Sequence, residues 1–254
     1  MSRIFDTHAH YEDSRFDFDR DALLKGLPLR GVEGVITCGI DIKTSEKALA
    51  LAETYPYIKA ACGIDPQEAD KVSPGDFARL SELLKNKNCV AIGEIGLEYH
   101  YDDVPRDTQL SVFEKQLKMA KYLHLPVIVH DREAHADTLR LLQKYRPAGV
   151  LHCFSGSVEM MEEIVKLGMY IGLGGVVTFK NAKKPLAVAS AVPLERLVME
   201  TDAPYMAPEP FRGKRCDSSL IPYAAAKIAE VRHMDTDALL AQTAENARRL
   251  FQIG

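Results

Sequence analysis

Short apolar runs alternate with longer amphipathic stretches along most of this chain, and this alternation constrains the fold more than any other feature. The runs are rich in β-branched residues, which is typical of parallel strands that are buried on both faces. Eight strands are predicted, at residues 3–8, 33–39, 58–64, 89–96, 126–131, 148–154, 169–175 and 196–202. Apolar residues at helical spacing predict amphipathic helices between the strands, among them helices at 45–55, 107–124 and 157–168.

Eight strand–helix pairs in succession predict an α/β fold, namely a single (β/α)8 TIM-like barrel with an extra C-terminal helix at 236–251. The main alternative is a doubly wound open sheet, which also alternates strands and helices. A length of 254 residues, of which 46% are hydrophobic, is enough for one large core. No linker, low-complexity segment or block of like charge interrupts the chain, so a single domain is expected over residues 1–254.

The formal net charge of −4 argues against a protein that holds nucleic acid by bulk positive charge. It leaves a nuclease possible, because bound metal ions can supply the positive charge that meets a phosphate. The five cysteines form no CxxC pair and are expected to be free thiols in a reducing compartment. No secretory segment and no apolar run of about 18 residues is present, so we expect a soluble, cytoplasmic protein without a membrane partner. No obligate protein partner is evident.

Side chains that can bind metal ions recur at the carboxyl ends of five predicted strands. They are His8, His10, Glu94, His130, His152 and Asp202. In a barrel these strand ends meet at one mouth, where the active sites of this fold lie. Nitrogen and oxygen donors without a thiolate suit Zn, Mn, Fe, Co or Mg, and six donors suit two ions better than one. Two neighbouring ions can clamp a phosphoryl group and activate a water molecule.

Taken singly, each of these residues could have a purely structural role. A histidine at a strand end is commonly a hydrogen-bonded core residue, and Glu94 could be a buried structural acid. Asp202 could cap a helix that begins in the Ala-Pro sequence after it. Packing alone does not readily supply metal-binding groups at five strand ends, and this coincidence favours a metal site. Asp6, one step deeper on the same strand face as His8, is expected to orient a ligand imidazole.

Five motifs, in this order and spacing, resemble those of the TatD-type metal-dependent deoxyribonucleases. They are DTHAH (6–10), GEIGLEYH (93–100), VIVHDREAHADTL (127–139), LHCFSGS (151–157) and METDAPYMAP (199–208). The resemblance runs from Ile4 to the segment ENARRLF (245–251), which is nearly the whole chain. It implies an amidohydrolase-like barrel and a divalent-metal hydrolase associated with 3′–5′ exonuclease activity and with DNA repair or degradation.

The resemblance also implies roles for the candidate metal-binding residues. One ion would be held by His8, His10, Glu94 and Asp202, and the second ion by Glu94, His130 and His152, with Glu94 as the bridge. Asp202 would accept a proton from the attacking water, so Glu94 and Asp202 are the predicted catalytic residues. The expected cofactors are two divalent ions, Mg, Mn or Zn.

Substrate contacts are predicted in the loops above the mouth. Arg132 stands where the family pattern is H-S/T-R, and it is expected to bind a phosphate through two hydrogen bonds. A surface ion pair with Glu133 or Asp137 is the alternative. The resemblance also puts the loop FRGKR (211–215) at the substrate. The other expected substrate contacts are His100, Asp65, Arg212 and Arg215.

Three departures from the family pattern alter the predicted substrate walls. The G-x-H-P-H sequence expected after strand three is replaced, so that Asp65 and Gln67 stand where the family has histidines. Asp131 adds an acid in the strand-five motif, and an expected R-N-E-P sequence contains Cys216 and Asp217 instead. An unpaired acid at the mouth would repel a phosphate. Hydrolase chemistry is therefore a safer expectation than nuclease specificity.

Three hypotheses follow. The leading one is a metal-dependent phosphodiesterase that acts on DNA ends, although the chain has no Trp and few aromatic residues in the mouth loops to stack on bases. The second is a metal-dependent hydrolase that cleaves an ester or amide bond instead of a phosphodiester, namely a deacylase or amidohydrolase that acts on aminoacylated RNA or on a small amide or ester. The third is a barrel without catalysis that binds a metal or a partner.

Overall fold

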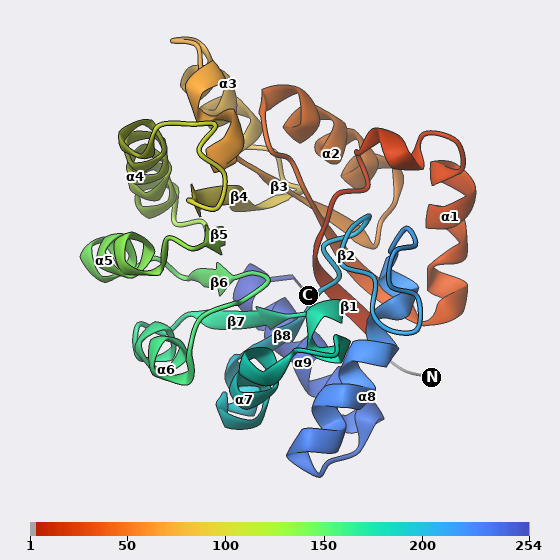
Figure 1. Cartoon of the computed structure of the whole chain (residues 1–254). Coiled ribbons are helices and arrows are strands. Elements are labelled where there is room, and N and C mark those ends of the chain that lie inside the picture. Colours follow the sequence, from red (N-terminus) through yellow and green to blue (C-terminus); the bar gives the residue numbers. More distant parts are fainter. Residues whose placement is uncertain (1–3, 254) are drawn as a thin grey trace.

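The computed structural model describes residues 4–253, and it arranges eight parallel strands in one sheet in the order β1 to β8 (Figure 1). The strands are β1 (Ile4–Ala9), β2 (Val32–Cys38), β3 (Ile58–Cys62), β4 (Cys89–Glu98), β5 (Val127–Arg132), β6 (Gly149–Leu151), β7 (Tyr170–Leu173) and β8 (Leu197–Met199). Just past β8, the Asp202 N–H donates to the His8 carbonyl at 2.9 Å, and the His10 N–H donates to the Ala203 carbonyl at 2.6 Å. Sequential pairing and this contact between the first and last strands confirm the barrel and exclude the open sheet.

Helices surround the strands, as Figure 1 shows. They are α1 (Arg20–Gly26), α2 (Ile42–Thr54), α3 (Asp76–Leu83), α4 (Arg106–Leu123), α5 (His135–Tyr145), α6 (Val158–Lys166), α7 (Lys183–Ala191), α8 (Ile221–Arg232) and α9 (Thr236–Phe251). Local signals account for several starts. The Ser157 hydroxyl accepts the N–H of Met160 at the start of α6, and Asp41 and Thr44 form a reciprocal capping box at the start of α2. The extra C-terminal helix has the predicted bounds.

The barrel interior is packed at one end by α9. Inward-facing side chains of the strands, such as Phe5, Ile128 and Val198, form one buried cluster with Leu250 and Phe251 of that helix. The side-chain amide of Asn246, also on α9, donates to the carbonyl of Leu194, just before β8, and to that of Leu197, the first residue of β8 (2.7 and 2.8 Å). Because α9 covers the amino ends of the strands, the carboxyl ends form the mouth.

Strand lengths differ from the sequence prediction at the mouth. The strand β4 continues to Glu98, whereas β6 and β8 have only three residues each. After β6 the Cys153 N–H donates to the Oε1 atom of the Glu200 side chain rather than to a neighbouring strand. All five cysteines are free thiols, and four of them are buried. Within residues 4–253, no helix has the length and apolar character needed to cross a membrane.

Candidate metal centre

Six side chains converge at the mouth, and we call them the donor cluster: His8, His10, Glu94, His130, His152 and Asp202. Glu94 lies at the centre of the cluster. Its Oε2 is 3.3 Å from His8 Nε2 and 3.4 Å from His10 Nε2. Its Oε1 is 2.9 Å from His130 Nδ1 and 2.8 Å from His152 Nε2. Each carboxylate oxygen therefore faces a different pair of imidazoles.

Within the donor cluster, Asp202 lies beside His8 and His10. Its Oδ1 lies 3.6 Å from His8 Nε2 and 3.5 Å from His10 Nε2. His8 is also stacked on His152, with ring centroids 3.9 Å apart and an interplanar angle of 9°. The geometry groups Asp202 with His8 and His152 as three donors within reach of one ion, beside the groups that contain Glu94.

The backbone at two positions brings these side chains together. Gly96 has a φ of 149°, and a Cβ there would lie 2.0 Å from the His130 carbonyl oxygen, so the residue lets β4 approach β5 closely. Asp202 has a φ of 62° and is followed by a turn in which the Tyr205 N–H bonds to its carbonyl at 2.8 Å. No helix begins there among the described residues, so the alternative that Asp202 caps a helix is wrong.

The electrostatics of the cluster suit cation binding. Burial opposes ionisation of Glu94, but the imidazoles around it, His152 and His8 foremost, hold its pKa well below the ordinary value. Burial likewise opposes ionisation of Asp202, and His10 holds the pKa of that carboxyl low. Burial lowers the pKa of His8 to about 4, so this ring is neutral at pH 7 and can donate a lone pair. Both acids are thus anionic in the form that binds a cation.

Two other imidazoles hold protons more tightly. Burial lowers the pKa of His10, yet its contacts with Asp202 and Glu12 outweigh burial and raise that pKa well above the ordinary value. The pKa of His130 is raised in the same way against burial, by Glu94 and Glu98. Since a coordinating imidazole must be neutral, cation binding at these rings releases protons and weakens at low pH.

Three buried glutamates lie behind the donor cluster, and none of them was predicted as a site residue from the sequence. Glu12 Oε1 is 3.2 Å from His10 Nδ1, and Glu98 Oε2 is 3.2 Å from His130 Nε2. Glu200 lies 4.0 Å from His152 Nδ1. Carboxylates in such positions fix the tautomer and the orientation of a ligand imidazole. The signal that could have found them is an acid inside or directly beside an apolar strand run.

Glu200 differs from the other two glutamates. Burial raises its pKa to about 8, which favours the protonated form at neutral pH. Its Oε2 and the neighbouring His152 Nδ1 have no hydrogen-bond partner among the described residues. A Cβ at Gly172 would lie 2.3 Å from Glu200 Oε2, so a glycine is required beside this carboxyl group.

The partners of Asp6 correct one prediction. Its carboxylate accepts hydrogen bonds from the hydroxyls of Thr201 and Ser218, both at 2.6 Å, and from the backbone N–H groups of Thr201 and His8. No imidazole of the described chain bonds to it, so the expected direct orientation of a ligand ring is wrong. Asp6 instead fixes the backbone of β1 against the segment after β8.

Apart from Asp65, the predicted substrate residues fall into two groups. Arg132 and Arg212 have no carboxylate partner in the described part of the chain, so the alternative of an ion pair between Arg132 and Glu133 or Asp137 is wrong. The other two predicted residues are engaged within the protein. His100 Nδ1 lies 2.8 Å from Glu133, and Arg215 donates to both carboxylate oxygens of Asp19 at 2.7 and 2.6 Å.

The residues that depart from the family pattern differ in whether they have polar partners. Asp131 lies 2.9 Å from His135 Nδ1 and Asp217 caps a short helical turn at Ser218–Leu220, so neither carboxylate is unpaired. Asp65 accepts the backbone N–H of Gln67 and has no cationic partner among the described side chains. Burial, with the charge of Glu94 added, raises its pKa to about 7. Cys216 is fully buried and takes no part in the mouth surface.

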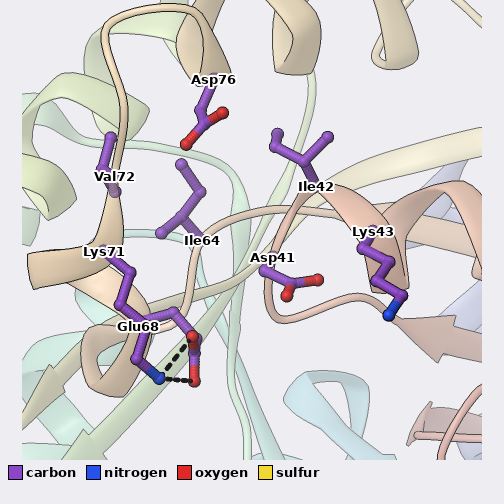
Figure 2. A pocket seen from close by; sticks show the side chains of 8 residues that line it. All are labelled: Asp41, Ile42, Lys43, Ile64, Glu68, Lys71, Val72 and Asp76. Atoms are coloured by element: carbon purple, nitrogen blue, oxygen red, sulfur yellow. Dashed lines mark hydrogen bonds and ion pairs between the residues drawn. The ribbon is translucent and has the colours of Figure 1, made fainter.

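A cavity of about 250 Å³ lies between the start of α2 and the segment after β3, and Figure 2 shows the side chains that line it. The acids on its wall are engaged: Glu68 pairs with Lys71 at 2.8 Å, Asp41 caps α2, and Asp76 accepts the Ser73 N–H. No member of the donor cluster lines it. Among residues 4–253, the groups of side chains that could hold a divalent ion all belong to the donor cluster, which offers imidazole and carboxylate donors and no thiolate.

Comparisons with known proteins agree with this geometry. A model of the TatD related DNase family matches residues 5–252. The chain is 41% identical to the uncharacterized metal-dependent hydrolase YabD of Bacillus subtilis, over 98% of this chain and 99% of that protein. It is 34% identical to the 3′–5′ ssDNA/RNA exonuclease TatD of Erwinia tasmaniensis, over 98% and 100%. The crystal structure of the TatD homolog YjjV from Escherichia coli superposes with a TM-score of 0.94 at 33% identity, covering 100% of this chain and 99% of that one.

Proposed function

This chain belongs to the TatD related DNase family of metal-dependent hydrolases, and from that premise we propose that it removes nucleotides from the 3′ end of single-stranded DNA with two divalent ions. The observation that carries the proposal is the position of Glu94. Its two oxygens face two different pairs of imidazoles, which supports a carboxylate that bridges two ions. A relative at 34% identity bears the name of a 3′–5′ ssDNA/RNA exonuclease, which supports the substrate and the polarity.

The residues divide the chemistry between them. Divalent ions in the donor cluster would supply positive charge to the phosphoryl oxygens and lower the pKa of a nearby water molecule. Asp202 is the proposed proton acceptor, because its side chain is 16% exposed against 6% for Glu94 and is therefore more open to water. Its depressed pKa keeps it ionised, ready to receive a proton at Oδ. Arg132, without a carboxylate partner, would bind the phosphate.

The experiment combines metal analysis with a cleavage assay. Purified protein is analysed for bound metals and then assayed with Mn²⁺, Mg²⁺ or Zn²⁺ on 5′-labelled single-stranded DNA with a free or a blocked 3′ end. We expect stepwise shortening from the free 3′ end only, and a loss of roughly 10²- to 10⁴-fold in Glu94→Gln and Asp202→Asn. The exposed Glu195, on a turn that precedes β8, provides the matched control Glu195→Gln. Full activity in the two cluster variants would refute the proposal.

Asp65 favours a second candidate, a metal-dependent deacylase or amidohydrolase. This buried acid at the mouth has no cationic partner in the described chain, and it could accept a hydrogen bond from an amino group of an acyl substrate. A panel of aminoacyl esters, including aminoacylated RNA, and of small amides tests this candidate. Turnover that is lost in Asp65→Ala, while DNA cleavage persists, would support it. If no ester or amide of the panel is hydrolysed while DNA is cleaved, this candidate is excluded.

A further inference from the structure

An exposed tyrosine and an arginine lie together on one flank of the donor cluster. Tyr205, in the loop after β8, is 41% exposed, and its ring centroid is 6.5 Å from that of His10. The Arg15 guanidinium, from the short 3-10 helix Ser14–Phe16 after β1, lies 4.3 Å from the Tyr205 ring centroid. An aromatic face and a positive charge therefore stand directly beside a member of the cluster.

A second pair of the same kind lies on the other flank. Tyr101, in the loop after β4, is 44% exposed, and the Arg132 guanidinium at the end of β5 lies 5.1 Å from its ring centroid. In a ring of eight sequential strands, β4 and β5 lie opposite β8 and β1. The two tyrosine–arginine pairs thus flank the donor cluster from opposite sides of the mouth.

The charges of these arginines are available to a ligand. Many surface cations of this chain are paired with acids, as in Arg79 with Glu46 and Arg215 with Asp19. Neither Arg15 nor Arg132 has a carboxylate within ion-pair distance among residues 4–253, and each rests against an aromatic ring instead. A guanidinium held in this way keeps all its N–H donors for phosphate oxygens.

We infer that the pairs Tyr205–Arg15 and Tyr101–Arg132 are two nucleotide-binding units, which hold a single-stranded polynucleotide across the donor cluster by stacking a base on each tyrosine and binding a phosphate with each arginine. Stacking on an aromatic face requires an unpaired base, which selects single strands over duplexes. Asp102 and Asp103 follow Tyr101 in the chain, so the Tyr101 unit depends on Arg132 for its positive charge. The inference rests on the proposed function, since it assigns the substrate contacts of the same site.

The experiment compares two probes that differ only in their bases. Fluorescence anisotropy measures the binding of a short single-stranded DNA oligonucleotide and of an abasic oligonucleotide of equal length, with Mn²⁺ present and in an Asp202→Asn background that blocks cleavage. Tyr205→Leu and Tyr101→Leu should each weaken binding of ordinary DNA by roughly 5- to 150-fold and leave abasic binding unchanged. Arg15→Gln and Arg132→Gln should weaken binding of both probes and lower the slope of log K against log salt by about 0.7 each.

Matched variants control for damage to the fold. Tyr205→Phe keeps the ring and should bind as the parent does. Tyr122→Leu removes a tyrosine that is 83% exposed on α4, and Arg146→Gln removes an exposed cation after α5; both should leave binding unchanged. The inference is overturned if the two leucine variants bind ordinary DNA as tightly as the parent protein does. It is also overturned if they lose as much affinity for the abasic probe as for ordinary DNA.

The cleavage assay separates this inference from the proposed function. If the parent protein cleaves no phosphodiester with any ion while tyrosine-dependent binding persists, the proposed function fails and the binding units stand. If DNA is cleaved but the tyrosine variants keep the KM of the parent protein, the inference fails and the proposed function stands.

Discussion

Replacing Asp6 by asparagine tests how burial and hydrogen bonding compete at the base of the donor cluster. The Asp6 side chain is fully buried and accepts four hydrogen bonds, two from hydroxyls and two from backbone N–H groups. Burial raises its pKa and the four bonds lower it, with a net rise from 3.8 to about 6. Asparagine has nearly the same shape but cannot ionise.

The direction in which the free energy of unfolding changes with pH follows from proton binding in the folded and unfolded states. Between pH 4 and 6 the folded protein keeps a proton on Asp6 that the unfolded chain has lost, so the free energy of unfolding falls as the pH rises. The full effect is about 3 kcal/mol for a shift of roughly two units. About 1.4 kcal/mol of that loss lies between pH 5 and pH 8, and the contribution is constant above the folded pKa.

Urea unfolding of the metal-free protein, followed by circular dichroism at pH 5, 6, 7 and 8, measures this difference. The stability of the parent protein relative to Asp6→Asn should decline by about 1.4 kcal/mol over the series, because histidines that titrate in both proteins cancel. A difference that is constant with pH, or that grows in favour of the parent protein at high pH, would refute the reasoning. A constant difference would mean that the four hydrogen bonds balance burial, and a growing one that they outweigh it.

Three further predictions concern the cluster and its supports. Glu98→Gln removes the carboxylate behind His130, and calorimetry should find Mn²⁺ binding roughly 10- to 100-fold weaker; unchanged affinity would contradict the role of Glu98. Gly96→Ala forces a Cβ against the His130 carbonyl at a φ of 149°, and it should lower the Tm by roughly 5 °C or more. Gly75→Ala, in open space, is the control, and equal shifts would disprove the steric argument. Mn²⁺ at about 100 times its Kd for the parent protein, added after EDTA treatment, should raise the free energy of unfolding of the parent protein by about 2.7 kcal/mol. The same Mn²⁺ concentration should stabilise His152→Ala by much less, and an equal gain in both proteins would exclude His152 as a ligand.

The sequence was a sufficient guide where local chemistry determines the outcome. Alternating strand and helix patterns predicted the barrel, and the bounds of α9 were predicted to the residue. The six members of the donor cluster were also identified in advance, because parallel strands in sequential order bring their carboxyl ends to one mouth. Pattern and topology together therefore define which side chains meet.

The sequence was a poor guide where the partner of a polar group lies far along the chain. Asp6 bonds to Thr201 and Ser218, about two hundred residues away, rather than to an imidazole on its own strand. Arg215 and Arg132 both appeared to be substrate residues, yet only Arg215 is neutralised by an acid, Asp19. No periodicity or spacing records such long-range pairs.

The sequence by itself determined the barrel, its mouth and the residue types that converge there, because those follow from strand order and from side chains that are local to each strand end. Only the tertiary structure decided which oxygen of Glu94 faces which imidazoles, which glutamates support the rings, and which arginines keep a free charge. The physical reason is that an ion pair, a hydrogen bond or a stacked ring depends on distances of a few ångströms between residues that are distant in the chain.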